Sequence, residues 1–333
     1  GCLWPADRVL LGLRSCKWLR EALLCSARQV LLRTKAHRSR NPIHPIESIV
    51  EDIRKFGNCG GELYVDFATP DVRCLSFSDP QIFVAMLNIV KIHEGLLQAL
   101  SLGMSKFIAR IDLSGNRIGD DRAVQLAFAL ESCKVISHLN LEANEIGDYG
   151  AGRLVGICSP CTTLVHLDLR DNRIGRSEEG RGVTFAGEFA KCTALTHLDL
   201  SSNSLGHDRH REGALNIVGA LGACTGLTYL NLSGNTLGQH AVRLLSKQIA
   251  ACANLAHLDL GGNVMRRDGA RSIAGALGSC TAITHLNLRV NSLGDEGAAC
   301  VAAALSHATG QQLAHLDLSA NSISEGGARE LAR

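Results

Sequence analysis

Short segments in which leucine alternates with polar residues recur along the second two thirds of the chain. In residues 138–141 two leucines alternate with a histidine and an asparagine, so one side is apolar and the other polar. A period of two predicts a strand with one buried face. Elsewhere, as in residues 270–277, apolar residues fall at i, i+3, i+4 and i+7, which predicts an amphipathic helix.

The same unit repeats eight times, and each copy carries an asparagine just after its strand. These asparagines are Asn116, Asn144, Asn172, Asn203, Asn235, Asn263, Asn291 and Asn321, at intervals of 28, 28, 31, 32, 28, 28 and 30 residues. Each copy fits L-x-x-L-x-L-x-x-N-x-L, as in residues 164–174. One strand–helix unit cannot bury its own apolar face, so the repeats are expected to stack as a solenoid.

Residues 106–333 resemble ribonuclease-inhibitor-type leucine-rich repeats in their 28-residue period and in the Asp-Glu-Gly-Ala helix start at 295–298. The resemblance implies an α/β solenoid of eight repeats, the last one incomplete. It would form an open horseshoe with a parallel concave sheet and convex helices. Such repeats also occur in the sensor domains of NLR immune receptors and in the activator of the Ran GTPase, so the resemblance implies protein binding.

The region before these repeats is predicted to consist of two parts. Residues 1–45 form a basic segment and linker, with a helix expected over 1–34 as a cap on the array. Nine Lys and Arg against two acidic residues give residues 1–40 a charge of +7, so the remainder of this +2 chain carries −5. Residues 46–105 are predicted to be irregular capping repeats, with a strand at 62–67 and a helix at 80–102.

Two other interpretations of the basic segment stay open. Residues 4–20 faintly resemble an F-box, with a Pro-x-Asp step and a Cys-x-x-Trp-like step, but the interval between them is short for that family. The Arg-rich, acid-poor composition also fits a targeting peptide, so organelle import stays open. Acylation at Gly1-Cys2 after removal of an initiator Met is not supported, because Pro5 stands where the myristoylation pattern has Ser or Thr.

The cysteines also follow the repeat. The chain has 13 of them, and one occurs at the end of most predicted helices: Cys133, Cys161, Cys192, Cys224, Cys252 and Cys280. A column at one repeat position with an odd total predicts buried free thiols in an intracellular, reducing compartment such as cytoplasm or nucleus. No apolar run reaches the roughly 18 to 20 residues of a membrane span.

Two polar columns are expected on the concave face. The residues before the first strand leucine are Arg110, His138, His166, His197, Tyr229, His257, His285 and His315. Those between the two leucines are Asp112, Asn140, Asp168, Asp199, Asn231, Asp259, Asn287 and Asp317. Adjacent strands lie about 4.8 Å apart, so these side chains should stack as structural ladders that pair across the sheet. A metal site between imidazoles is the weaker alternative.

The sequence provides no set of residues typical of catalysis. No Ser or Cys stands out beside a histidine, and no phosphate-binding loop occurs. The C-x-x-C at 158–161 includes a member of the cysteine column and lacks a redox context. We therefore expect no enzyme activity, no cofactor and no metal.

The third and fourth intervals are the longest, with insertions of three residues after Gly175 and of four after Gly206. Both insertions follow a strand and precede a helix, and insertions in solenoids commonly map to a binding face. Neutral drift of loop length is the alternative. With ring residues of the neighbouring strands, the predicted partner-binding set is Arg176, Glu178, Glu179, Arg181, His207, Asp208, Arg209, His210, Arg211, Tyr229, His166 and His197.

The expected function is a protein-interaction module, either a scaffold or an assembly subunit. It would use the concave face and the rim of the third to fifth repeats. The alternatives are a substrate adaptor of a cullin-type ubiquitin ligase, and a GTPase activator or NLR-like sensor fragment. The predicted partner is a protein, within a larger complex. The body of the chain has no basic excess, so nucleic acid is not expected.

Overall fold

In the part of the chain that the structure describes, eleven strands form one parallel sheet in the order of the sequence. The computed structural model describes residues 8–10, 29–33, 62–66, 108–130, 136–158, 163–176, 181–206, 211–307 and 313–332. The strands are β1 (Arg8–Leu10), β2 (Gln29–Arg33), β3 (Glu62–Asp66), β4 (Ile108–Asp112), β5 (His138–Asn140), β6 (His166–Asp168), β7 (His197–Asp199), β8 (Tyr229–Asn231), β9 (His257–Asp259), β10 (His285–Asn287) and β11 (His315–Asp317).

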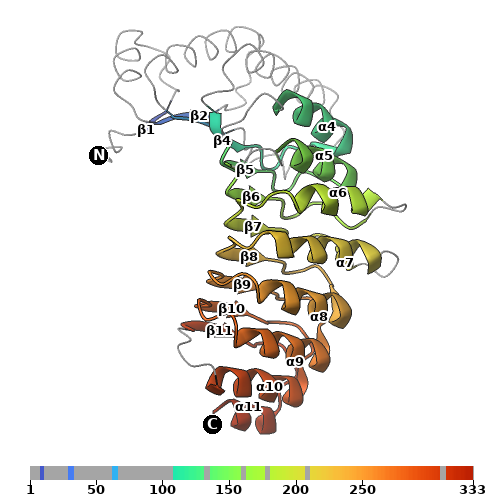
Figure 1. The fold of residues 1–333 in the computed structure, drawn as a ribbon, viewed down its shortest axis with the longest axis vertical. Helices are drawn as coiled ribbons and strands as arrows, with labels where there is room; N and C mark the ends of the chain where they lie inside the picture. The colour runs from blue at the N-terminus through green and yellow to red at the C-terminus, as the bar shows by residue number, and fades with distance from the viewer. Residues whose placement is uncertain are drawn as a thin grey trace, which may run out of the picture.

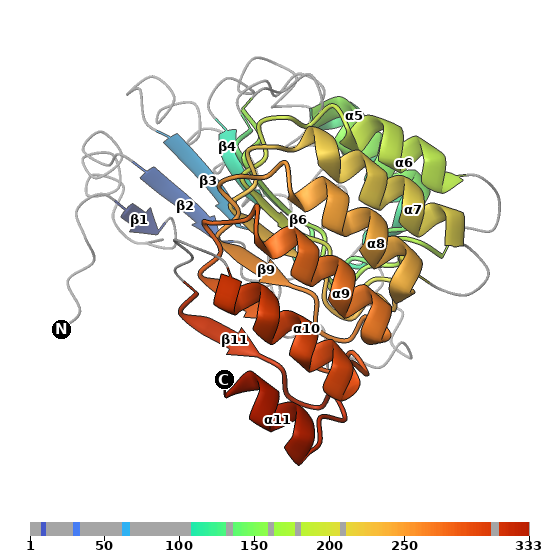
Figure 2. The same ribbon diagram turned by 60° about the horizontal axis from the view of Figure 1, so that its bottom comes forward.

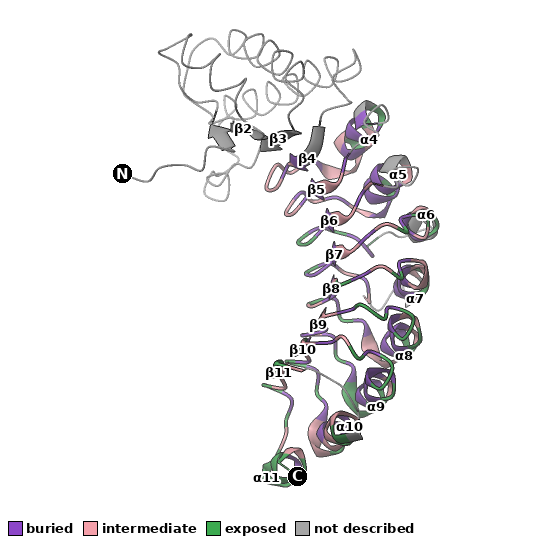
Figure 3. Ribbon diagram, turned by 60° about the vertical axis from the view of Figure 1, so that its left-hand side comes forward, coloured by how far each residue is buried: buried purple, intermediate pink, exposed green. Residues whose placement is uncertain are grey.

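A helix follows each strand from β4 onward and packs on one face of the sheet (Figures 1 and 2). The helices are α4 (Gly119–Leu130), α5 (Asp148–Cys158), α6 (Arg181–Phe189), α7 (Arg211–Ala220), α8 (Gly238–Ile249), α9 (Arg266–Leu277), α10 (Gly294–His307) and α11 (Glu325–Leu331). Figure 3 shows that the described elements follow an arc, with the helices outside and the strands inside. The predicted open, curved α/β solenoid is therefore confirmed.

The hydrophobic core lies between the sheet and the helix layer. Both leucines of each pair are buried in the interior repeats, as Leu198 and Leu200 are, each fully inaccessible. In α6, Phe185 and Phe189 are also fully buried. Core residues form one continuous cluster along the array, so each repeat is stabilised by its neighbours (Figure 3).

The repeat asparagine links consecutive units through its side-chain amide. The Asn263 Nδ2 group donates to the carbonyls of Leu232 in the preceding repeat, at 2.9 Å, and of Leu260 in its own repeat, at 3.0 Å. Its Oδ1 accepts from the Leu237 backbone N–H, at 3.2 Å. Seven of these eight asparagines are buried. The amide thus satisfies backbone groups of two repeats where the chain leaves the strand, and buried groups of this kind require a partner.

The region before residue 106 differs from the prediction where the structure describes it. A helix was predicted over residues 1–34, but β1 and β2 lie there and pair in parallel with each other. The prediction is wrong at these residues, because the apolar run in β2 pairs with β3 and extends the repeat sheet. The strand predicted at 62–67 is confirmed by β3. The helix predicted at 80–102 lies outside the described residues.

The cysteine column lies at the ends of the helices and forms a second ladder. Cys192, Cys224, Cys252 and Cys280 are buried and free. The Cys224 thiol donates to the carbonyl of Cys192 at 3.5 Å, and the Cys252 thiol to that of Cys224 at 3.6 Å. Burial raises the pKa of Cys224 to about 12 and that of Cys280 to about 11, so both stay protonated. Cys133 and Cys161 lie outside the described residues.

Replacing Asn263 by alanine tests the amide ladder. The substitution leaves two buried carbonyls and one N–H without their side-chain partner, and we expect the free energy of unfolding to fall by about 2 to 4 kcal/mol. The matched control is Asn216→Ala, because Asn216 is an exposed residue of α7. Denaturant unfolding measures both, and equal effects would contradict the assigned role.

Thiol reactivity tests the cysteine column. Because burial keeps these thiols protonated, we expect them to react slowly with a disulfide reagent in the native protein. All 13 cysteines should react once the chain is denatured without reductant. A denatured count short by several thiols would show that disulfides had formed.

Candidate functional site

The concave face carries an unbroken stack of aromatic rings across seven adjacent strands. The rings are His138, His166, His197, Tyr229, His257, His285 and His315. Their successive centroid distances are 5.3, 4.0, 3.9, 4.5, 5.5 and 5.8 Å, so the stack is tightest around Tyr229. The rings stack because parallel pairing puts each one directly beside its equivalent, as His166 lies beside His197 in the register.

Burial within the stack keeps the inner rings, His197 and His257, uncharged. Burial, followed by the neighbouring His166, lowers the pKa of His197 to about 4. Burial and then His285 lower the pKa of His257. Both imidazoles are therefore neutral at pH 7, and the middle of the stack is an uncharged surface. Burial also raises the pKa of Tyr229, so its hydroxyl keeps its proton.

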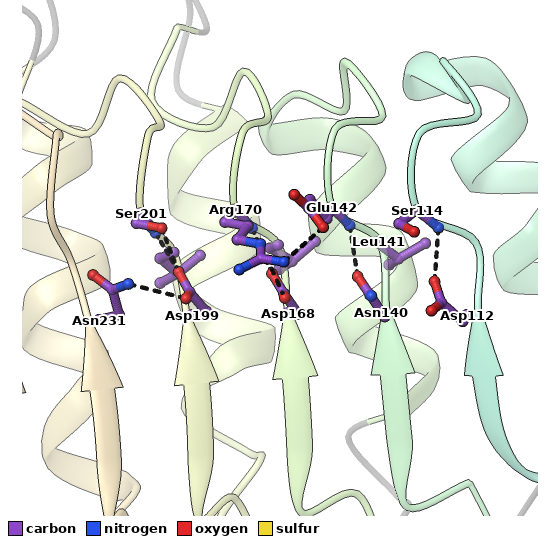
Figure 4. Close-up of polar contacts among 12 residues, drawn as sticks. Asp112, Ser114, Asn140, Leu141, Glu142, Asp168, Arg170, Asp199, Ser201 and Asn231 are labelled. Atoms are coloured by element: carbon purple, nitrogen blue, oxygen red, sulfur yellow. Dashed lines mark hydrogen bonds and ion pairs between the residues drawn. The ribbon is translucent and has the colours of Figure 1, made fainter. Parts of the chain in front are cut away.

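The second polar column, formed by the Asp and Asn residues between the two strand leucines, holds the ends of the strands in place. In each repeat, the Oδ1 atom of the Asp or Asn accepts the backbone N–H two residues later, as Asp199 does from Ser201 at 2.9 Å (Figure 4). The amides also bond along the column: Asn231 Nδ2 donates to Asp199 Oδ2, and Asn287 Nδ2 to Asp259 Oδ2, each at 3.0 Å. An alternation of Asp and Asn thus suits this column, because the amide supplies a donor to each carboxylate.

Asp168 and Asp199 interrupt that alternation, because two aspartates lie opposite each other on β6 and β7. Asp168 is 7% exposed. Burial raises its pKa to about 6, with Asp199 adding to the increase and the Arg170 backbone N–H opposing it. The Arg170 guanidinium lies 3.4 Å from Asp168 and 2.7 Å from Glu142 (Figure 4). Arg170 therefore offsets only part of the repulsion between the carboxylates of Asp168 and Asp199.

The predicted ladders exist, but they form within each column. Imidazoles stack on rings and carboxylates bond to amides and backbone, so the expected His–Asp pairing across the sheet is not what organises the face. Among the described residues, no group of three or more His, Cys, Asp or Glu side chains is placed to hold a metal ion. No described helix is both long and apolar enough to cross a membrane.

The predicted site residues divide into three groups. His166, His197 and Tyr229 lie together in the ring stack. Arg176 is exposed where the first insertion begins, and Arg181 and Arg211 begin α6 and α7. The remaining six, Glu178, Glu179, His207, Asp208, Arg209 and His210, lie outside the described residues. The two insertions nevertheless start on adjacent loops, since the Ser204 N–H donates to the Ile174 carbonyl at 2.8 Å.

The predicted set omitted the acidic pair on the same strands. Asp168 and Asp199 were assigned to a structural ladder, together with all other members of their column. The available signal was the order of that column, in which these are the two successive aspartates. The insertions follow the strands that carry this pair. The two longest insertions, the acidic pair and the one tyrosine of the described ring stack thus all lie on β6 to β8 or on the loops that follow β6 and β7.

Comparison with known proteins identifies the repeat. Five segments match the family model described as Leucine Rich repeat: residues 161–176, 191–208, 223–241, 251–274 and 279–302. No curated protein matches the sequence. The chain thus contains leucine-rich repeats, and its fold is an α/β leucine-rich-repeat solenoid. Such repeats generally act as non-enzymatic modules for protein–protein interaction.

Solved structures show similar chains at low identity. The structure of a TLR13–ssRNA13 complex is 17% identical with a TM-score of 0.49, over 90% of this chain and 37% of that one. A Bacteroides fragilis protein is 15% identical with a TM-score of 0.35, over 73% and 68% of the two chains. An internalin from Listeria monocytogenes is 15% identical with a TM-score of 0.21, over 61% and 80%. The chain therefore spans little more than a third of the TLR13 chain.

Replacing Asp168 by asparagine tests the like-charge pair. The raised pKa means that the folded state holds the Asp168 proton more tightly than the unfolded state, so ionisation above about pH 6 costs stability. We expect Asp168→Asn to raise the free energy of unfolding by about 1 to 3 kcal/mol at pH 7.5. The gain should shrink as the pH falls toward 4.

The matched control is Asp259→Asn. Asp259 already receives a hydrogen bond from Asn287 and has asparagines on both sides, so its replacement should bring no gain. Denaturant unfolding between pH 4 and pH 8 measures both variants. A gain for Asp168→Asn that does not change with pH would rule out relief of charge as its cause.

Proposed function

We propose that the chain is a non-enzymatic protein-interaction module, a scaffold or assembly subunit that binds a protein partner through its concave face. The observation that supports this most is the ring stack. The helices cover one face of the sheet, whereas the other face presents a continuous column of rings beside a column of carboxylates and amides. The repeat period and the helix in every described repeat support the ribonuclease-inhibitor subtype.

The stacking geometry supports a protein partner over a single-stranded nucleic acid. Non-specific binding of nucleic acid strands uses aromatic faces on which bases stack, beside a basic groove. Here the interior ring faces are covered by neighbouring rings, as Tyr229 is by His197 at 3.9 Å and His257 at 4.5 Å. What these rings can offer a partner is their edges, with ring nitrogens and one hydroxyl as hydrogen-bonding groups.

The rim of the third to fifth repeats is the second part of the proposed surface. It comprises the two insertions, with Arg176 exposed at the start of the first, next to the strands that carry Asp168 and Asp199. Tyr229, the single non-histidine in the described stack, lies on the next strand and offers the kind of anchor that interfaces favour. Rim charges mainly set the association rate, and a buried anchor sets dissociation.

Fewer observations support the remaining proposals on function and location. The free, buried cysteines support an intracellular, reducing compartment. A role as ubiquitin-ligase adaptor depends on residues 4–20, of which the structure describes only β1, and no described contact favours this role over the general one. The same holds for a GTPase activator or sensor fragment.

Shortening the rim tests the proposed surface. Removing three residues from 176–181 and four from 207–212 restores the 28-residue spacing, and neither segment supplies apolar residues to the core. We expect thermal melting to stay within a few degrees of the parent. Binding to partners identified by affinity capture and mass spectrometry should weaken at least about tenfold. If the shortened protein binds every captured partner as tightly as the parent, the insertions reflect neutral drift of loop length and do not form part of the binding surface.

Tyr229 is tested separately, because it belongs to the ring stack as well. Tyr229→Ala should increase the dissociation rate by about tenfold or more and leave the association rate unchanged. Tyr229→His restores the repeat consensus and keeps a stacked ring, so it separates the tyrosine hydroxyl from the stack. The control is Phe128→Ser on the convex helix α4, where Phe128 is 58% exposed. Equal effects of Tyr229→Ala and Phe128→Ser would place the interface elsewhere.

A further inference from the structure

The ring stack places six ionisable imidazoles in one continuous column, so that the charge of each affects its neighbours. From His138 to His315 each ring stacks on the next, so no described histidine of the stack can gain a proton without placing a charge beside a neighbouring ring. Around Tyr229 the spacing is 4.0, 3.9 and 4.5 Å. At 4.0 Å, charges on both His166 and His197 would repel each other, whereas Tyr229 separates His197 from His257.

The groups that face the stack come from several strands. Asp199 and Asp259 raise the pKa values of His197 and His257, whereas burial and the neighbouring histidines lower them more strongly. Ser137 and Thr284 hydroxyls lie 2.8 and 2.9 Å from the Nδ1 atoms of the histidines that follow them. Arg110 lies beside His138 at the start of the ring column. The column between the two leucines and the positions just after the second leucine add the other charged groups from β4 to β11: Asp112, Glu142, Asp168, Arg170, Asp199, Asp259, Arg289 and Asp317.

This count makes the sign of the charge on the concave face depend on the imidazoles. Six carboxylates and three guanidiniums give −3 when the rings are neutral, and six imidazolium charges would give +3. Asp168 shifts the balance in the same direction, because its pKa of about 6 lets it lose its charge in mild acid. A surface that changes sign in this way reverses its electrostatic preference for a partner.

We propose that the ring stack is a pH-sensitive switch in the concave surface, which binds a basic polypeptide surface at neutral pH and releases it when the histidines protonate. The partner class follows from charge complementarity with the net negative columns. The stack itself supplies the response, because protonation replaces ring stacking with repulsion between adjacent strands. Its binding half rests on the proposed function, and its titration half is a property of the protein alone.

The titration half is tested by NMR on the full-length protein labelled at histidine. Signals of the ring Hε1 protons are followed from pH 8 to pH 4 and assigned through single His→Gln variants. We expect His197 to titrate near pH 4 and His257 below 6.5. His166→Gln removes the neighbouring charge and should raise the midpoint of His197 by about half a unit or more.

His315→Gln is the matched control, because His315 lies at the far end of the stack from His197 and is exposed. It should leave the midpoint of His197 unchanged. His240, an exposed residue of α8 outside the stack, serves as the internal signal for an intact protein. Midpoints near 6.5 for both inner histidines, insensitive to His166→Gln, would overturn the switch.

The binding half is tested with a partner captured at pH 7.5. We expect affinity to fall at least about tenfold between pH 7.5 and pH 4.0, the pH near which His197 gains its proton, while the protein stays folded. Equal or tighter binding at pH 4.0 would overturn the release mechanism. If no partner is captured, the proposed function fails while the NMR result still decides the titration. If the rings titrate independently, the concave surface can still bind and the switch alone is wrong.

Discussion

The buried asparagine amide at the end of each strand is the interaction on which the rest of the structure depends. It bonds to carbonyls of two consecutive repeats and accepts a backbone N–H, as Asn291 does toward Leu260 and Leu288 at 2.8 and 3.0 Å. Such an amide has one geometry that satisfies every group, so successive repeats must stack in one register. The leucines then fall into the core, and the strands pair residue for residue.

Fixed register turns any repeated residue into a continuous column. A histidine once per repeat becomes a stack of rings, an aspartate or asparagine becomes a hydrogen-bonded file, and a cysteine becomes a series of thiol–carbonyl contacts. Strand spacing of about 4.8 Å is close to the distance at which rings stack and carboxylates repel. The properties of the concave face therefore belong to columns, and a single substitution changes its neighbours on both sides.

Sequence periodicity predicted most of the fold, because the repeat makes the same local preferences agree eight times over. It failed at β1 and β2, where an apolar segment of mixed pattern joined the sheet through pairing with neighbours that no local signal specifies. For the site, it located His166, His197 and Tyr229 on one face and predicted that the polar columns form ladders. Which group each side chain contacts within its ladder, a ring, an amide or a backbone N–H, depends on side-chain direction and burial, which spacing alone does not contain.

Asp168 shows where folding and function separate. Asn140, Asn231 and Asn287 fill the same column and accept the same backbone N–H, so the fold does not need a carboxylate at residue 168. The carboxylate nevertheless lies buried opposite Asp199, at a cost that its raised pKa records. Local departures of this kind, in an otherwise consistent repeat, are most often explained by function. The insertions follow the same two strands, so two independent departures from the consensus coincide on one part of the concave surface.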